Sequence, residues 1–428
     1  MRGMFYDVRV VESYSLKISI ENGKVEKVKL DESRGKAFRV LKNGFWGYFV
    51  GDVDDREGIS LAERNAVGKG DADILNVSSS GKFVLKPKED FRDVSVEEKV
   101  KFLRDVEKNL KSDKIVSTSV TYFENIRRLR YYDSNGNEVF YEVPRIGLII
   151  SAVAKDKTLQ FYSKRIMKPA GLEALKRAYD LSNEVVEVVT KLVNAKTPPS
   201  GYMNVVADSS LAGVFIHEAF GHAVEGDHVL QGASVLANKL GQKVADDCVN
   251  IYDDPTVKEF GFYPFDDEGV KAEKRTIVEN GILKDYLHSR ETALKFNSKA
   301  GNARAEGLKF PIVRMSNTYL DSGDHRFDEL LEIAKNGIYL VGSRGGETNP
   351  ATGYFQFNAQ YGYLIEGGEL AEMVRDVSLS GYTLEILKDI KIGRELEFDP
   401  GFCGKEDQLV PVSDGSPPVL IRALVGGS

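Results

Sequence analysis

The residues best suited to chemistry in this 428-residue chain are three histidines that lie close together in the sequence. They are His217, His222 and His228, and the carboxylate Glu218 directly follows the first of them. Imidazole nitrogens bind transition metals, and a glutamate beside a metal ligand is placed to take a proton from an activated water. One interpretation of the segment is therefore a metal site with hydrolytic chemistry.

The first two histidines are five residues apart, one more than in the familiar His-Glu-x-x-His motif. In a regular helix, positions five apart point about 140° away from each other, whereas positions four apart differ by only about 40°. One inserted residue, a π-bulge, would turn His222 back towards His217, and Gly221 lacks the Cβ that would resist it. The alternative is a helix that ends at Gly221, with His222 on the following turn.

The same segment also has a purely structural interpretation. Leu211 and Phe215 recur at helical spacing after Asp208, a typical N-cap residue, so a histidine on this helix can be an ordinary core residue. Glu218 and His222 can likewise form a simple surface pair at i, i+4. The motif alone does not decide between these interpretations.

A catalytic zinc site needs a third protein ligand, and the chain offers few nitrogen or sulfur atoms for it. Asp227 and His228 have the character of turn residues, although His228 can orient a metal ligand. Cys403 lies in a glycine-flanked segment, where a turn would let its thiolate approach an ion. Cys248 lies in a strand-like apolar context, which favours a small buried residue.

The composition excludes several classes of protein. The chain carries 58 basic and 65 acidic side chains, a net charge of −7, without a Lys/Arg-rich block, so we expect no nucleic-acid partner. No apolar run approaches the roughly 18 residues that span a bilayer, and the N-terminus lacks the apolar core of a signal peptide. The two cysteines cannot build a disulfide framework. We therefore expect a soluble, cytoplasmic protein without a membrane partner.

Alternating apolar and polar residues in the N-terminal part predict antiparallel strands. Asn-Gly pairs at residues 22–23, 43–44 and 135–136 mark hairpin turns, because both turn positions favour positive φ. Gly147–Ala154 predicts a further strand. The result is a sheet assembled largely from hairpins.

Two helices and a domain boundary complete this part of the chain. Ser95–Leu110 predicts a helix with Ser95 as its N-cap, and Gly171–Asn194 predicts a long amphipathic helix. The proline- and glycine-containing stretch at 197–201 predicts the boundary between an N-terminal domain, residues 1–197, and a C-terminal domain, residues 198–428.

Beyond this boundary, short apolar segments alternate with glycine turns, such as Asn280-Gly281, Asn336-Gly337 and Gly367-Gly368. This pattern is typical of an antiparallel, β-rich unit. The predicted fold class is therefore α+β, with an α/β N-terminal domain and a β-rich antiparallel C-terminal domain that carries the histidine helix.

The histidine segment resembles the signature of the TldD/PmbA family, once called modulators of DNA gyrase and now regarded as zinc-dependent peptidases. The resemblance covers nearly all of residues 201–428 in order, and residues 35–45 more loosely. Its blocks include His217-Glu218-Ala219-Phe220-Gly221-His222, Asp266-Asp267-Glu268-Gly269, Gly301-Asn302-Ala303-Arg304, Arg314-Met315-Ser316-Asn317, Gly345-Gly346 and Gly401-Phe402-Cys403-Gly404. Ordered agreement across many blocks is more specific than the His/Glu motif alone.

The resemblance implies that His217, His222 and Cys403 hold Zn²⁺ and that Glu218 is catalytic. It also implies a dimer, either of identical chains or with a TldE/PmbA-type paralogue that lacks the motif. Glu218 would act as general base towards a zinc-activated water in the hydrolysis of small or unfolded polypeptides. In one place the chain departs from bacterial members, which often have a second arginine where Ala305 follows Arg304.

Substrate contacts are less visible in the sequence. Arg304 and His288 are candidates to bind an oxyanion or a substrate carboxylate, as is Arg314. Gly345 and Gly346 are candidates for a strand edge that pairs with an extended peptide, although glycines also serve turns and bulges. The rival hypothesis is a non-catalytic binding or regulatory subunit with a structural metal, which a complete four-ligand shell would favour.

Overall fold

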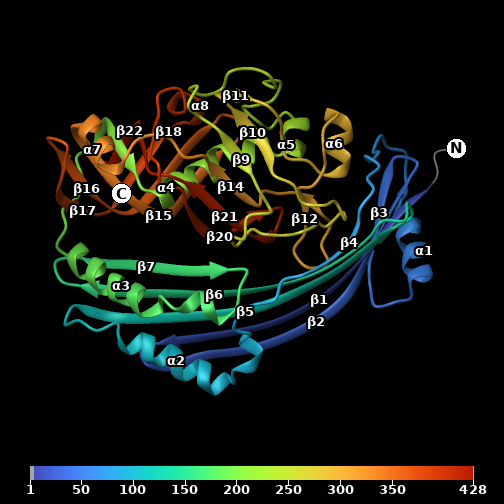
Figure 1. Ribbon diagram of the computed structural model, residues 1–428, viewed down its shortest axis with the longest axis horizontal. Coiled ribbons are helices and arrows are strands. Elements are labelled where there is room, and N and C mark those ends of the chain that lie inside the picture. Colours follow the sequence, from blue (N-terminus) through green and yellow to red (C-terminus); the bar gives the residue numbers. More distant parts are fainter. Residues whose placement is uncertain (1–3, 428) are drawn as a thin grey trace.

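The computed structural model of the chain describes residues 4–427. The N-terminal segment, in which we expect no signal peptide, has its first three residues outside this range. Long strands dominate its N-terminal part (Figure 1). They form one sheet in the order β3-β2-β1-β5-β6-β4, with β7 also paired to β6. Their bounds are Phe5–Glu21 (β1), Lys24–Lys42 (β2), Phe45–Val50 (β3), Ser80–Val84 (β4), Ile115–Asp133 (β5), Glu138–Lys155 (β6) and Leu159–Lys168 (β7).

The hairpin predictions for this sheet are confirmed. At residues 22–23 the φ angles are 49° and 79°, and at 43–44 they are 53° and 72°, so both Asn-Gly turns use the left-handed region. The turn at 135–136 joins β5 to β6, with Gly136 at φ 85°. Gly147–Ala154 is not a separate strand, because β6 continues unbroken through it from Glu138.

Three helices accompany the sheet, namely α1 (Asp55–Asn65), α2 (Val96–Lys108) and α3 (Ala178–Leu192). The α2 prediction is confirmed, since Ser95 and Glu98 form a reciprocal capping box at its start. The single long helix expected at Gly171–Asn194 is wrong in its first turn. Leu172–Leu175 instead form a separate 3₁₀ turn with i→i+3 bonding, before α3 begins.

Two larger sheets make up the C-terminal part. One contains β8 (Gly201–Ala207), β15 (Asn336–Asn349), β16 (Tyr354–Glu366), β17 (Glu369–Val374), β18 (Val377–Tyr382), β19 (Lys391–Ile392) and β22 (Val419–Gly427). The other contains β9 (Ile251–Asp253), β10 (Arg275–Glu279), β11 (Ile282–Leu283), β14 (Asn317–Leu320), β20 (Glu397–Lys405) and β21 (Gln408–Ser416). The small ribbon β12 (Ala303–Arg304) and β13 (Ile312–Val313) lies apart.

The C-terminal sheets are mixed rather than purely antiparallel, because β8 pairs with β15 and β14 with β21 in parallel. Asn336-Gly337 begins β15 instead of forming a hairpin turn. The remaining helices are α4 (Ser209–Phe215), α5 (Gly226–Leu230), α6 (Arg290–Phe296), α7 (Phe327–Ala334) and α8 (Thr383–Ile386). The mixed α+β class is confirmed, whereas the domain division at residue 197 stays a prediction.

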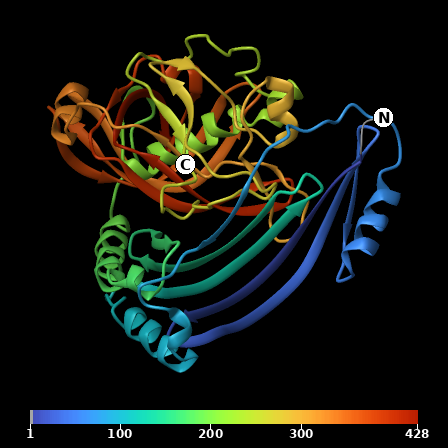
Figure 2. The ribbon, with the colours of Figure 1, turned by 45° about the vertical axis from the view of Figure 1, so that its right-hand side comes forward.

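The long N-terminal strands curve, and the C-terminal elements lie on their concave side (Figures 1 and 2). Phe123 of β5 packs against both Phe260 and Phe402, with ring centroids 6.1 Å from each. Arg165 of β7 pairs with Asp399 of β20 at 2.8 Å. The sheet therefore supports the strand β20 directly. None of the helices among residues 4–427 is long and apolar enough to cross a membrane.

This support depends on a glycine. Gly147 of β6 lies opposite Phe123 in the register, and a Cβ at Gly147 would be 2.1 Å from the Phe123 ring. We expect Gly147→Ala to displace that ring and to lower the free energy of unfolding by about 1–3 kcal/mol in urea denaturation. Gly401→Ala is the matched control, because open space surrounds Gly401 on strand β20. Equal unfolding midpoints for the two variants would contradict this role of Gly147.

Candidate metal centre

The histidine helix changes its pitch at the motif. It begins at Asp208, whose carboxylate accepts from the Leu211 backbone N–H at 2.8 Å, and runs as α4 to Phe215. Residues 216–221 then form a π-helical turn, and His222–Val224 form a 3₁₀ turn. The predicted π-bulge is therefore present, and His222 lies on the 3₁₀ turn that follows Gly221, so the structure combines features of both alternatives. A Cβ at Gly221 would lie 2.1 Å from the Met315 sulfur, so a larger residue there would have to displace the Met315 side chain.

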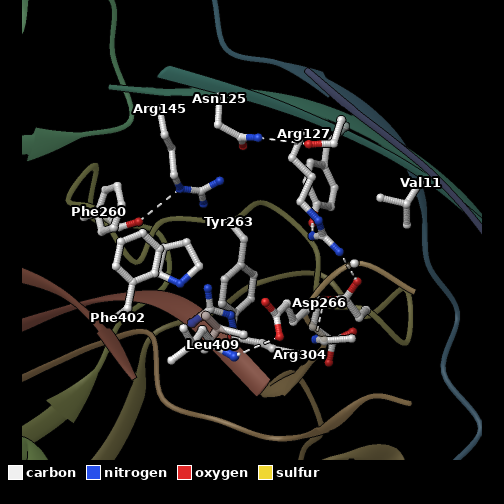
Figure 3. A pocket seen from close by; sticks show the side chains of 18 of the residues that line it. Val11, Asn125, Arg127, Arg145, Phe260, Tyr263, Asp266, Arg304, Phe402 and Leu409 are labelled. Atoms are coloured by element: carbon white, nitrogen blue, oxygen red, sulfur yellow. Dashed lines mark hydrogen bonds and ion pairs between the residues drawn. The ribbon is translucent and has the colours of Figure 1, made fainter. Parts of the chain in front are cut away.

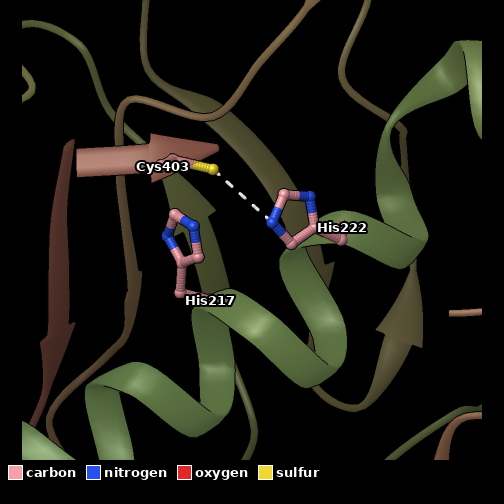
Figure 4. A group of neighbouring side chains, drawn as sticks. All are labelled: His217, His222 and Cys403. Atoms are coloured by element: carbon pink, nitrogen blue, oxygen red, sulfur yellow. Dashed lines mark hydrogen bonds between the residues drawn. The ribbon is translucent and has the colours of Figure 1, made fainter. Parts of the chain in front are cut away.

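The side chains of His217, His222 and Cys403 converge as a result (Figure 4). One ligand atom from each lies within 4.8 Å of the others, and His222 Nε2 is 3.5 Å from Cys403 Sγ. The three residues are only 1%, 8% and 3% exposed, respectively. Two imidazoles and a thiolate at such separations are a donor set that suits Zn²⁺.

The two cysteines lie in different structures from those expected. Cys403 belongs to strand β20, not to a turn, and its partner across the β20–β21 hairpin is Val410. The flanking glycines leave the strand intact because β21 pairs with it along its full length. Cys248 is exposed and lies in a turn, so the expectation of a buried strand residue is wrong.

A carboxylate contacts the Nδ1 atom of each histidine. Asp414 Oδ1 of β21 is 2.7 Å from His217 Nδ1, and Glu225 Oε2 is 3.0 Å from His222 Nδ1. Each carboxylate favours a proton on Nδ1 and so presents Nε2 as the ligand atom. Helix α4 can approach β21 because of Gly213, where a Cβ would be 2.7 Å from the Asp414 carbonyl oxygen.

The same contacts set the charges of the cluster. Burial lowers the pKa of both histidines, but it is outweighed by Asp414 and Cys403 at His217 and by Glu225 and Cys403 at His222. The pKa of His217 is thus raised well above its ordinary value, and that of His222 to about 10. Burial opposes ionisation of Cys403, yet the two histidines lower its pKa to about 5. The sulfur is therefore held as a thiolate, the form that binds metals.

Glu218 lies at the open side of this buried cluster. Its side chain is 39% exposed, and its Oε2 is 3.7 Å from His222 Nε2, the atom that faces Cys403. The carboxylate is thus next to the donor atoms while remaining accessible to water. This is the position that a general base towards a water molecule requires.

Asp227 and His228 are helical rather than turn residues, because both belong to α5. His228 Nδ1 lies 3.3 Å from the His222 carbonyl oxygen and 3.5 Å from Glu225 Oε2, the same carboxylate oxygen that contacts the His222 ring. Lys405 Nζ lies 2.7 Å from Asp227 and 3.2 Å from Glu225. The cation of Lys405 therefore occupies the space between these two carboxylates.

Among the predicted substrate contacts, Arg314 is buried and donates to the backbone carbonyl oxygen of Cys403. His288 is fully buried and contacts Thr292 at 3.0 Å. Arg304 is buried and donates to the Met315 carbonyl at 2.7 Å. Gly345 and Gly346 lie at an exposed irregularity of the β15–β16 pairing. Their roles in substrate binding stay predictions.

Sequence reasoning gave no role to Asp414 or Glu225. Glu225 follows His222 by three residues, a spacing that places both on one side of a helical turn, so this signal was present in the sequence. Asp414 comes from a distant strand, and no local pattern connects it with His217.

Comparisons with known proteins agree with this site. Three models for the PmbA/TldA metallopeptidases match the chain, namely domain 1 at residues 6–68, the central domain at 89–193 and the C-terminal domain at 200–427. A metalloprotease of Archaeoglobus fulgidus is 63% identical over 99% of this chain and 100% of its own length. A zinc metalloprotease TldD homolog of Saccharolobus solfataricus is 31% identical over 99% of this chain and 96% of its own.

Solved structures share the fold. A Thermotoga maritima protein described as a modulator of a DNA gyrase has a TM-score of 0.84 at 24% identity, covering 99% of this chain and 96% of its own. TldE from Thermococcus kodakarensis has a TM-score of 0.78 at 18% identity, covering 99% and 97%. From the family models and the two curated relatives, the chain belongs to the PmbA/TldD family of metallopeptidases.

Proposed function

We propose that this metallopeptidase uses Zn²⁺ to hydrolyse peptide bonds in small or unfolded polypeptides. The observation that carries the proposal is the buried convergence of two imidazoles and one thiolate beside the accessible carboxylate of Glu218. The zinc-dependent relative from Saccharolobus solfataricus supports the choice of metal. The donor set supports it independently, because a thiolate with two imidazoles suits zinc better than calcium or magnesium.

Each residue has a distinct task in this proposal. His217, His222 and Cys403 would hold the ion, while Asp414 and Glu225 fix the orientation of the two imidazoles. When bound, zinc supplies Lewis acidity that polarises a carbonyl and makes a water molecule more acidic. With these three residues as its protein ligands, zinc would keep a position for water, as in other catalytic zinc sites.

Glu218 moves the proton. Its carboxylate takes a proton from the attacking water and then delivers it to the leaving amine. One thiolate lowers the formal charge of a zinc centre from +2 to +1, so water acidification by the ion is weaker and the base matters more. The half-exposed position of Glu218 supports this role, because the carboxylate can meet both water and substrate.

The rival hypothesis, a non-catalytic binding or regulatory subunit with a structural metal, requires a fourth protein ligand. Within the described residues, the group of donors at this site consists of His217, His222 and Cys403. The three-donor set therefore favours the peptidase. The dimer, with an identical chain or with a TldE/PmbA-type paralogue, stays a prediction.

Replacing Glu218 separates chemistry from metal binding. We expect Glu218→Gln to reduce cleavage of casein and short peptides at least about 100-fold, because the amide cannot accept the proton of water. Zinc content measured by elemental analysis should stay the same. Glu187→Gln, on the exposed face of α3, is the control and should keep full activity. Turnover by Glu218→Gln at the level of the unchanged protein would refute the assignment.

The two cysteines form a natural pair for testing the metal ligands. Cys403→Ala removes the only thiolate of the cluster, so bound zinc should fall well below one ion per chain in elemental analysis. Cys248→Ala changes an exposed cysteine elsewhere and should leave zinc content unchanged. If both variants retain a full complement of zinc, Cys403 is not a ligand.

Asp414 provides a test of ligand orientation. We expect Asp414→Asn to weaken zinc binding about 10–100-fold in competition with a chromophoric chelator, because the neutral amide no longer favours the proton on His217 Nδ1. Asp247→Asn is the control, since that carboxylate is 79% exposed and pairs with Lys243. Circular dichroism verifies that both variants fold. Identical zinc affinities would show that Asp414 does not act through His217.

A further inference from the structure

A cavity lies between the concave side of the N-terminal sheet and the C-terminal elements (Figure 3). Its volume is about 380 Å³, within the range of pockets that bind small molecules. Arg127 and Arg145 extend into it from the long strands, and Tyr263, Arg304 and Phe402 lie on the opposite wall (Figure 3). The cavity therefore has both aromatic and cationic walls.

The cavity is distinct from the metal centre, although the two share a hairpin. Successive side chains of a strand point to opposite faces of a sheet. On β20, Cys403 faces His222, whereas Phe402 faces the other way, towards Phe123 and Phe260. The β20–β21 hairpin thus separates the cavity from the three metal donors.

Two arginines of the cavity lack a carboxylate partner within the described part of the chain. Arg145 is 6% exposed and donates to the carbonyl oxygens of Phe260 and Phe262, at 3.2 and 2.6 Å. Arg304 is 5% exposed and donates to the Met315 carbonyl. Carbonyl groups satisfy hydrogen bonds but do not neutralise a buried charge, which is costly unless an anion compensates it.

The third arginine of the cavity shows the contrast. Arg127 Nη2 lies 2.5 Å from Asp267. This carboxylate compensates the buried charge of Arg127, so that residue needs no further anion. Burial and the nearby charges of Arg304 and Arg127 instead lower the pKa of Arg145 to about 9. Arg145 therefore carries the least compensated positive charge of the cavity, because Asp267 also acts on Arg304 from a distance.

We propose that this cavity binds a carboxylate attached to an apolar group, with Arg145 and Arg304 holding the carboxylate and the aromatic rings holding the apolar part. The fork of an arginine matches the two oxygens of a carboxylate. Asp266 and Asp267 also line the cavity, which disfavours a ligand with several negative charges, such as a phosphate ester. The free C-terminus of a peptide and a free carboxylic acid share the required chemistry.

The test uses the unchanged protein after removal of metal with a chelator, so that zinc cannot bind the carboxylate. Isothermal titration calorimetry compares N-acetylphenylalanine with its uncharged amide. We expect the acid to bind at least about tenfold more tightly, because only the acid pairs with the guanidinium groups. Equal affinities, or no binding of the acid, would overturn the proposal. The measurement does not depend on peptidase activity, so it stands or fails separately from the proposed function.

Arginine variants test whether the ligand binds in the cavity. Arg145→Met retains an unbranched apolar stem but removes the charge, and it should weaken acid binding about tenfold or more while leaving amide binding unchanged. Arg130→Met is the matched control, because Arg130 is exposed on β5 and pairs with Glu138. Unchanged acid affinity in a folded Arg145→Met protein would overturn the assignment. If that variant does not fold, the comparison of acid and amide still decides.

The source of the carboxylate is distinguished by two further ligands. A tripeptide that ends in phenylalanine tests a peptide C-terminus, and phenylpropionate tests a free acid. Tighter binding of the tripeptide supports capture of peptide ends, and tighter binding of phenylpropionate supports a small-acid site. Inorganic phosphate should not compete with either ligand, and strong competition by phosphate would contradict a carboxylate site.

Discussion

The π-helical turn at residues 216–221 is the constraint on which the candidate metal site depends. Without the extra residue in the turn, the two histidines would point about 140° apart, and no single ion could meet both. Gly221 lets this turn pack against Met315, because a Cβ there would have to displace the Met315 sulfur. A local departure from α-helical geometry therefore creates a donor pair that a regular helix with this spacing cannot provide.

Burial of the donors has an electrostatic consequence. Without metal, the thiolate of Cys403 and the imidazolium rings of His217 and His222 stabilise each other, as their shifted pKa values indicate. Binding of a divalent ion must displace protons from the Nε2 atoms of those rings, so metal affinity rises with pH while the histidines still titrate. Asp414 and Glu225 contact the Nδ1 atoms, on the other side of each ring from Nε2, so this exchange need not break their contacts.

The sequence predicted local features well and long-range contacts poorly. The Asn-Gly hairpins, the N-cap at Ser95 and the π-bulge follow from short patterns whose physics is local. Cys403 was selected through family resemblance, because its glycine neighbours suggested a turn where the structure has a strand. The contact of Asp414 with His217 and the two parallel strand pairs arise only from tertiary packing, which no short pattern encodes.

The β20–β21 hairpin also determines when the site can form. Cys403 lies 181 residues after His222, so a metal ion that binds both closes a very long loop of the chain. The entropy cost of closing that loop must be offset by favourable folding of the C-terminal sheets, which brings the donors together. A bound ion would cross-link the turn that follows α4 to β20, one of the last strands, in the way that a disulfide restrains an unfolded chain. A nascent chain that has been synthesised past His222 but not as far as β20 therefore contains both histidines but lacks Cys403.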